Sequence, residues 1–389
     1  MNNLFKLTAV ALLAGVAGTA HADLAETKGG LKIKTEDGRF EGALAGRIHF
    51  DYASISEDIK DEGADKDGFY TRRAYLTFTG KLYGYKYKLE ADLKKGVEAK
   101  EMWIGTDLAG GLLMIGHNRP AYAMEGMTSS NDILFIERPF ISNNTIFSGR
   151  EYQNAVRYDY HSGGFGVKAA YYTANPDQDK DAGETPNSGN GYSARVTFAP
   201  IMESGSVVHI GASYDLASYA NDGDGADIKA KPAAKNGPSY TLVHAADYDE
   251  QSTITAEAGV VFGPLYAQGE YSVASFDGAG GSQDVTAYYV QAGYFLTGES
   301  RGYKVSKGGF VAPKPAGDKG AIELKARYDF VENSDAALNP EASVLSFGVN
   351  YYVNPQVRFM LDYNMAQYSE DGADDDKPEA IVARAQLKF

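Results

Sequence analysis

The chain has 389 residues, a formal net charge of -15, 44 glycines, 28 tyrosines, 18 phenylalanines and no cysteine. A helical membrane protein needs apolar runs of about 20 residues, and the one stretch that approaches this, residues 7–20, lies at the N-terminus. An acidic chain is a poor nucleic-acid binder, because phosphate contacts need clustered Lys and Arg, whereas abundant Gly and Tyr indicate many β-strands and turns.

Residues 1–22 are expected to be a secretory signal peptide. Lys6 precedes an apolar stretch, and Ala20, His21 and Ala22 form a small-x-small cleavage site before Asp23. The alternative, a core helix of a soluble protein, is disfavoured because the segment has no polar face. Residues 23–389 are therefore expected to be exported and to form one domain that is stable without disulfides.

From residue 39 onward, segments of alternating apolar and polar residues are separated by turn clusters. In the last segment, Ile381, Ala383 and Leu387 share one face, and Arg384 and Lys388 share the other. Strands of soluble β-sandwiches usually run about five or six residues, and most of these segments are longer. Sixteen strands are expected, at residues 39–55, 69–82, 85–96, 98–107, 111–118, 151–161, 163–175, 190–199, 205–217, 250–263, 264–276, 283–297, 319–333, 341–354, 355–369 and 379–389.

Short and long connections alternate between these segments. Short turns at 83–84, 109–110, 162–163, 263–264 and 354–355 alternate with long polar loops at 56–68, 119–150, 176–189, 218–249 and 370–378. An even number of strands joined in this way is typical of a bacterial outer-membrane barrel. Because lipid cannot satisfy an open sheet edge, the first strand must pair with the last. The expected fold is an all-β, transmembrane antiparallel β-barrel of 16 strands, wide enough for an aqueous lumen.

The acidic residues are concentrated in three expected outer loops. Residues 57–67, 177–184 and 370–377 together hold 15 Asp or Glu and 4 Lys, a net charge of -11. There they can meet the divalent cations of the lipopolysaccharide layer. Asp177, Asp179 and Asp181 are spaced as in a calcium loop, but Ala182 and Ser188 replace the required Gly and Glu. No metal site and no cofactor is expected.

The lumen is expected to be richer in bases than the loops. By alternation, Lys88 and Lys168 face inward, as do acids such as Asp51 and Glu257. The inward bases can line a pore, or they can brace the wall through pairs with these acids. The candidates for lining the pore on the strands are Arg47, Arg73, Arg157, Arg195, Lys325, Arg327, Arg358 and Arg384.

One connection on the short-turn side, residues 298–318, is too long for a simple turn. The span 299–319 carries Arg301, Lys304, Lys307 and two further lysines against two acids, a net charge of +3. Folded into the lumen, it would offer positive charge to an anion that sheds its hydration shell. The alternative is a solvated periplasmic flap.

Four stretches resemble the phosphate-selective outer-membrane porin family, the O and P type. They are residues 72–90, residues 128–138, Gly149 with Arg150, and residues 295–310, which begin Phe-Leu-Thr-Gly-Glu-Ser-Arg. The resemblance implies a trimeric barrel of 16 strands with inward-folded third loop, fifth loop and late periplasmic turn, and arginines and lysines that select phosphate-like anions. It adds Arg119, Arg138 and Arg150 to the candidate anion-binding residues. The third loop carries Arg119 where such porins usually have lysine.

The expected function is passive diffusion of small anions through an outer-membrane porin, with phosphate or pyrophosphate as candidate substrates. The alternative is a general porin for small hydrophilic solutes, including cations. No enzymatic activity is expected, because the five histidines of the mature chain show no catalytic or metal-binding spacing. Expected partners are small inorganic anions, lipopolysaccharide and outer-membrane lipid, the barrel-assembly machinery that recognises a C-terminal Phe389, and two further copies in a homotrimer.

Overall fold

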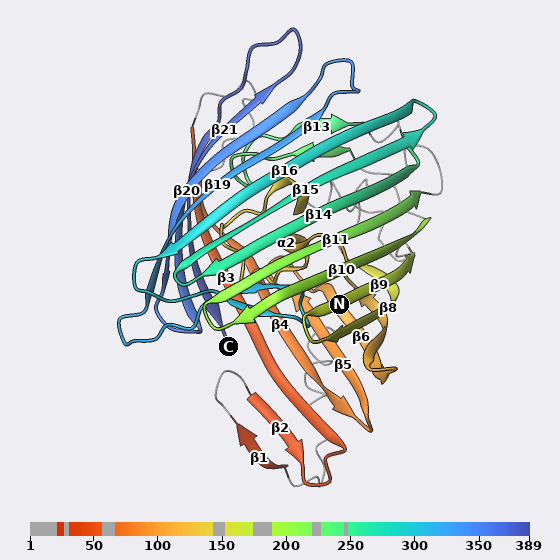
Figure 1. Ribbon diagram of the computed structural model, residues 1–389, viewed down its shortest axis with the longest axis vertical. Coiled ribbons are helices and arrows are strands. Elements are labelled where there is room, and N and C mark those ends of the chain that lie inside the picture. Colours follow the sequence, from red (N-terminus) through yellow and green to blue (C-terminus); the bar gives the residue numbers. More distant parts are fainter. Residues whose placement is uncertain are drawn as a thin grey trace, which may run out of the picture.

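The computed structural model describes residues 22–26, 31–56, 67–142, 152–173, 189–219, 227–244 and 248–389. An antiparallel sheet of 18 strands dominates the molecule (Figure 1). Two of these strands, β1 (Ala22–Glu26) and β2 (Leu31–Thr35), form an N-terminal hairpin. The other sixteen match the predicted segments one to one: β3 (Phe40–Ile55), β4 (Gly68–Leu82), β5 (Tyr85–Asp92), β6 (Glu98–Leu108), β7 (Gly111–Asn118), β8 (Gln153–Ser162), β9 (Phe165–Thr173), β10 (Gly189–Glu203), β11 (Ser206–Tyr219), β14 (Glu250–Phe262), β15 (Leu265–Gly278), β16 (Gly281–Phe295), β19 (Ala321–Asn333), β20 (Glu341–Tyr352), β21 (Val357–Ser369) and β22 (Glu379–Lys388).

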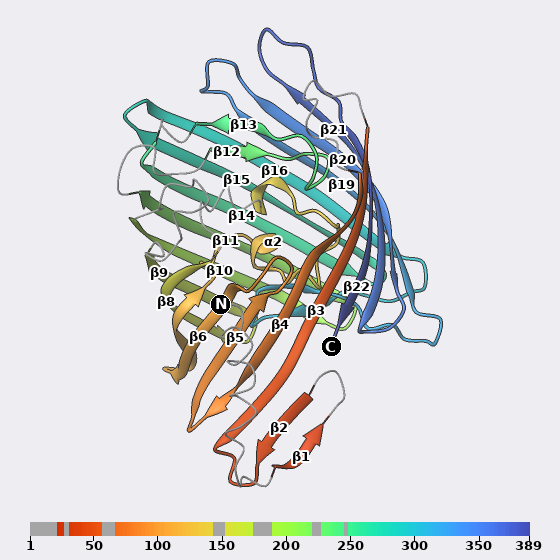
Figure 2. The same cartoon turned by 180° about the vertical axis from the view of Figure 1, so that it is seen from behind.

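The sheet closes into a barrel because its first and last long strands pair. β22 runs antiparallel to β3, from Lys388 opposite Arg47 to Ala380 opposite Ile55, and the two strands lie side by side in Figure 2. Gly46 and Phe389 then exchange both backbone hydrogen bonds. Closure therefore pairs the backbone N–H and C=O groups of the sheet edge, for which lipid offers no hydrogen-bond partner. The predicted barrel of 16 strands is confirmed.

The wall is polar inside and apolar outside. On β22, Val382, Arg384 and Gln386 are buried, whereas Ile381 and Leu387 are 49% and 42% exposed. Exposed aliphatic side chains that alternate with buried polar ones reverse the pattern of a soluble protein and suit a lipid-facing surface. Among the described residues, no helix is long and apolar enough to cross a membrane.

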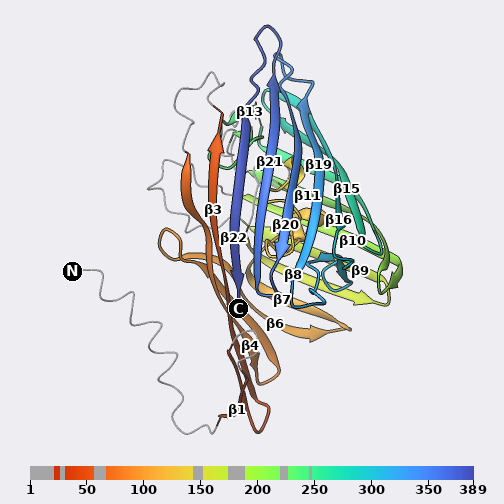
Figure 3. The same ribbon diagram turned by 90° about the vertical axis from the view of Figure 1, so that its left-hand side faces the viewer.

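The N-terminal hairpin extends the sheet below the closure point and was not predicted. Leu31 to Lys34 of β2 pair with Leu44 to Glu41 of β3, so β2 continues along the edge that β22 leaves at Gly46. Figure 3 shows the hairpin, labelled at β1, below the C-terminus. Some predicted bounds also shift. The turn after β8 lies at residues 163–164, where Gly163 adopts a positive φ of 54° that favours glycine, and β5 ends at Asp92 because the chain turns there.

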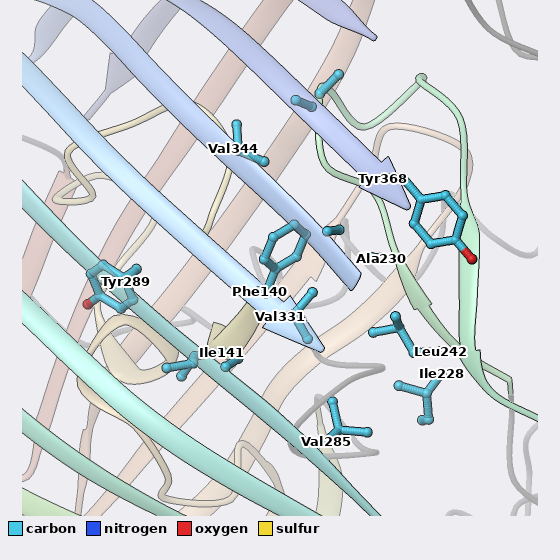
Figure 4. Close-up of a cluster of buried hydrophobic side chains, with 14 of the residues drawn as sticks. Phe140, Ile141, Ile228, Ala230, Leu242, Val285, Tyr289, Val331, Val344 and Tyr368 are labelled. Atoms are coloured by element: carbon cyan, nitrogen blue, oxygen red, sulfur yellow. The ribbon is translucent and has the colours of Figure 1, made fainter. Parts of the chain in front are cut away.

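Three segments fold into the lumen, as predicted. They are the third loop, with the short helices α2 (Met124–Met127) and η1 (Phe140–Ser142); the fifth-loop hairpin of β12 (Ile228–Ala230) and β13 (Tyr240–Val243); and the late-turn hairpin of β17 (Gly302–Lys304) and β18 (Gly309–Val311). Figure 4 shows Phe140 and Ile141 of the third loop in one buried cluster with hairpin residues Ile228 and Leu242. The apolar residues of these loops are buried only because the loops lie inside the barrel.

Candidate functional site

The first half of the third loop is held across the lumen by strand side chains. The Glu270 carboxylate on β15 accepts the backbone N–H groups of Met124 and Glu125, and it accepts the Tyr289 hydroxyl at 2.7 Å. The Ser213 hydroxyl on β11 accepts the N–H of Ala123 at 3.0 Å. These acceptors replace the water that a surface loop would bind, so the loop can cross a polar interior.

The second half of the loop is fixed from the opposite wall. The Ile136 N–H donates to Asp362 at 2.7 Å, and the Phe140 N–H donates to Asp329 at 3.0 Å. Lys325 donates to the Leu134 carbonyl at 3.0 Å. With anchors on β15, β11, β21 and β19, the third loop narrows the lumen from side to side.

Residues 298–318 also fold into the lumen, so the solvated flap is excluded. The Arg301 guanidinium donates to the Asp132 carbonyl at 2.8 Å. Lys307 pairs with the Asp132 carboxylate at 3.1 Å, and the Ala312 N–H donates to the same carboxylate. The late turn is thus tied to the third loop through Asp132.

A cavity of about 350 Å³ lies between this loop, the late turn and the barrel wall. Three acids line it, namely Glu90, Glu101 and Asp159. Eight bases line it, which gives a net formal charge of 8 - 3 = +5: Arg47, Arg73, Lys88, Arg119, Arg138, Arg157, Lys168 and Lys307. Its lining also includes six hydroxyl side chains: Tyr75, Thr128, Ser129, Ser130, Tyr152 and Ser306. The chain is acidic as a whole, but this constriction is basic.

A β-bulge allows two consecutive arginines to face the lumen. His49 of β3 pairs with Arg73 of β4, but the next residue, Phe50, pairs with Thr71, so Arg72 is the extra residue. Arg72 then reaches the third loop and pairs with Glu137 at 3.1 Å, while Arg73 lines the cavity. Simple alternation would have sent Arg72 to the lipid, so the pattern alone could not find it.

Arg73 differs from the other cavity bases in having no hydrogen-bond or ion-pair partner among the described residues, and its Nη1 is buried. By contrast, Arg47 donates to Ser130 at 3.0 Å and to Glu90 at 2.7 Å. Arg157 donates to Asp159 through both Nε and Nη2. An unpartnered guanidinium is costly, and because only its Nη1 is buried, its other nitrogens can donate to an anion in the cavity.

The remaining predicted site residues divide into three groups. Lys304 is an exposed residue of β17. Arg150 lies outside the described residues. The last group is at most 5% exposed and braces the wall, the third loop or the late turn; it comprises Arg195, Arg301, Lys325, Arg327, Arg358 and Arg384.

Two members of the bracing group show how their charge is used. Arg384 donates to both oxygens of Asp51 at 2.7 Å across the β22–β3 closure. Arg195 donates to both oxygens of Glu257 and to the Gly308 carbonyl of the late turn. These bonds are made within the protein, and neither arginine lines the cavity, so both shape the constriction without facing it.

The fifth loop adds one base, Lys235, that does not line the cavity. Burial and the positive charges of Arg72 and Lys94 lower the pKa of Lys235, in the fifth loop, to about 8. The positive charge of Lys235 is therefore partly lost slightly above neutral pH.

Comparison with known proteins agrees with this geometry. The model of the family "Phosphate-selective porin O and P" matches residues 43–389. Porin O of Pseudomonas aeruginosa is 29% identical over 97% of this chain and 95% of its own length. An uncharacterised protein of Caulobacter vibrioides is 24% identical over 93% of this chain and 76% of its own length.

Solved outer-membrane porins share the fold. An anion-selective porin from Comamonas acidovorans has a TM-score of 0.57 at 12% identity, covering 90% of this chain and 100% of that one. OmpT of Vibrio cholerae, in its trimer form, has a TM-score of 0.57 at 14% identity, covering 90% of this chain and 99% of that one. At these identities the likeness supports the fold alone.

Proposed function

Because the chain belongs to the family of phosphate-selective porins O and P, we propose that its basic cavity is the filter through which phosphate and related oxyanions diffuse. The protein is a porin of the bacterial outer membrane and a channel rather than an enzyme. We propose further that the channel prefers phosphate or pyrophosphate to other small anions, and that the protein has no enzymatic activity.

The unpartnered Arg73 guanidinium carries the proposal. A tetrahedral oxyanion offers several acceptor oxygens, and a guanidinium can donate to two of them at once. The hydroxyls of Ser129, Ser130 and Tyr152 line the same cavity and can donate to the remaining oxygens. A site with a charged donor and neutral donors replaces the hydration shell of the anion and still lets it leave.

The bases of the cavity are partly balanced by its acids, which suits a channel more than a tight binder. Lys88 pairs with Glu101 at 2.6 Å, and Lys168 pairs with Asp159 at 2.7 Å. The residual charge of +5 attracts anions, while the paired acids keep the affinity within the range that permits exit. A general porin that also passes cations is the alternative, and no contact among the described residues of the constriction favours it.

A planar-bilayer experiment tests this function. With a KCl gradient across the membrane, the reversal potential should show that chloride is more permeant than potassium. Phosphate added to the chloride solution should then reduce the chloride current by competing for the cavity. A potassium-selective potential that phosphate leaves unchanged would reject the proposal.

We propose in addition that three copies assemble, because part of the wall is too short to span lipid alone. β5 and β7 have 8 residues each, whereas a membrane strand tilted by about 45° needs about 9–11. Ile104 and Ile115 on neighbouring outer positions are 55% and 53% exposed. OmpT of Vibrio cholerae is described in a trimer form.

Native mass spectrometry should give a trimer, which Ile115→Arg should dissociate; a monomeric wild type would reject this assembly.

The protein is proposed to be exported, cleaved and inserted by components of the cell envelope. We propose that cleavage after Ala22 removes residues 1–22, and N-terminal sequencing of the purified protein should begin at Asp23. Deletion of Phe389 should reduce assembly by the barrel-assembly machinery, measured as the folded fraction in outer-membrane preparations. Contact of the acidic outer loops with lipopolysaccharide through divalent cations should make extraction of the protein sensitive to chelator.

A further inference from the structure

The outer surface of the barrel carries a hollow on the wall formed by β8 to β11. Ala169 of β9 and Ala194 of β10 pair across neighbouring strands and line it. In the same row, Tyr158 of β8 pairs with Ala169, and Tyr214 of β11 pairs with Ala194. Two small side chains therefore lie between two large ones, which leaves a depression of about 380 Å³. We call it the alanine hollow.

Two tyrosines border the alanine hollow on the side of the outer loops. Tyr171 of β9 and Tyr192 of β10 pair with each other, and their ring centroids lie 5.0 Å apart. Both side chains are exposed, and both line the hollow. No described residue of this chain fills the space that they border. Its occupant in the membrane is therefore lipid or another protein chain.

A group of aromatic rings projects from the outer surface of β3 and β4. Phe69 is 73% exposed, and its ring centroid lies 5.7 Å from that of Phe50 and 4.9 Å from that of Tyr52. The polar hydroxyl explains tyrosine at a membrane interface, but Phe50 and Phe69 have none. Like Tyr192, Phe69 lies near the strand end that leads to an outer loop. We call these three rings the aromatic knob.

The aromatic knob and the alanine hollow lie on opposite flanks of the short strands β5 and β7. Around the barrel, the pairings run from β4 through β5, β6 and β7 to β8. Copies arranged in a closed ring meet through two different surfaces, one flank of a copy against the other flank of the next. Each copy therefore presents a projection on one of these flanks and a depression on the other.

We propose that the aromatic knob of one copy occupies the alanine hollow of the next, with Phe69 packed on Ala169 and Ala194. This contact rests on the trimer proposed above and specifies which surfaces form it. In lipid, association depends on close packing rather than on the hydrophobic effect, and small residues permit that packing. Tyr171 and Tyr192 can then meet Phe69 in the offset or edge-on arrangements that aromatic pairs prefer. Three such contacts close the ring and leave no knob or hollow facing lipid.

Cysteine cross-linking tests the contact directly, because the chain contains no cysteine of its own. In Phe69→Cys with Tyr192→Cys, a short bismaleimide added to outer membranes should join copies head to tail and give a covalent trimer on a denaturing gel. Each single variant should remain a monomer there, since residue 69 of one copy meets residue 192 of the next. The matched control is Phe69→Cys with Val290→Cys. It should also remain a monomer, because Val290 is exposed on β16, on the far side of the barrel.

Filling the hollow provides a second test. Ala194→Trp occupies the space that Phe69 would enter, so the dissociation constant of the trimer, measured by native mass spectrometry on dilution, should rise by at least about fivefold. Ala292→Trp on β16 is the matched control, since Ala292 also lies between two alanines, Ala267 and Ala326. The control should dissociate like the wild type. Heat-dependent mobility on a gel should show that both variants remain folded barrels.

The outcomes separate this contact from the trimer on which it rests. A trimeric wild type, combined with no covalent trimer from Phe69→Cys with Tyr192→Cys, would overturn the contact and leave the assembly standing. Cross-linked dimers of Phe69→Cys alone would show a symmetric contact and would also overturn it. A trimer unaffected by Ala194→Trp would assign the hollow to lipid and reject the contact. A monomeric wild type would overturn both proposals.

Discussion

Replacing Arg73 with glutamine tests the role of the unpartnered guanidinium. The variant removes one of eight cavity bases, so the formal charge of the cavity falls from +5 to +4. A hydrogen bond to a charged group contributes about 1.5–3 kcal/mol, and each 1.4 kcal/mol is about tenfold in affinity. Phosphate should therefore bind about 10- to 100-fold more weakly. The phosphate concentration that halves the chloride current in a planar bilayer measures this change.

Arg157→Gln is the matched control for Arg73→Gln. It removes the same charge from the same cavity, but the Arg157 donors already serve Asp159, at 2.7 and 2.8 Å, and the Arg119 carbonyl, at 2.9 Å. Its effect on phosphate binding should be less than about fivefold, since only long-range attraction is lost. Equal effects of the two substitutions would refute the reasoning that an unpartnered donor forms the anion contact.

Three further predictions follow from the loops. Lys235 has a pKa lowered to about 8, so it loses its charge as pH rises from 7 to 9; chloride permeability relative to potassium should fall over this range, and the fall should be smaller in Lys235→Arg. Burial alone would raise the pKa of Asp132, but Lys307 and the Ala312 N–H lower it below its ordinary value. The contacts between Asp132 and the late turn are therefore lost only as pH falls through that lowered pKa. Asp132→Asn lacks the charge at every pH, so it should show increased open-channel current noise already at neutral pH. Glu270→Gln replaces one of the two oxygens that accept third-loop amides with an NH2 group, which leaves a buried N–H unsatisfied at a cost of about 1–3 kcal/mol. Hydrogen exchange in residues 121–128 should therefore accelerate about 5- to 150-fold; unchanged exchange would show that the other anchors suffice.

Much of the barrel could be predicted because alternation along a strand directly reflects which face meets lipid. Ile381 and Leu387 were expected on the outer face and Arg384 on the inner one, and the burial of β22 agrees. The length of the connection at residues 298–318 and the net charge of +3 on residues 299–319 likewise suggested an inward fold, because a simple turn needs neither. The pairing of β2 with the lower part of β3 could not be foreseen, since it depends on where β22 ends.

The contacts within the constriction were less predictable, because the face of a strand on which a side chain lies does not determine which residues it pairs with. Arg384 and Arg73 both face inward by alternation, yet Arg384 is bound by Asp51, a residue 333 positions away, and Arg73 has no partner among the described residues. Such pairings depend on cross-strand register and on bulges. Lys88 and Lys168 were expected to face inward and do line the cavity, but only the path of the third loop shows that they reach it.

The most direct test of the account is a single-channel record of the wild-type protein in a planar bilayer, with phosphate titrated into a KCl gradient. We predict a reversal potential that shows chloride to be more permeant than potassium, and a chloride conductance that falls as phosphate occupies the basic cavity. A cation-selective potential that does not change with phosphate would contradict the central claim.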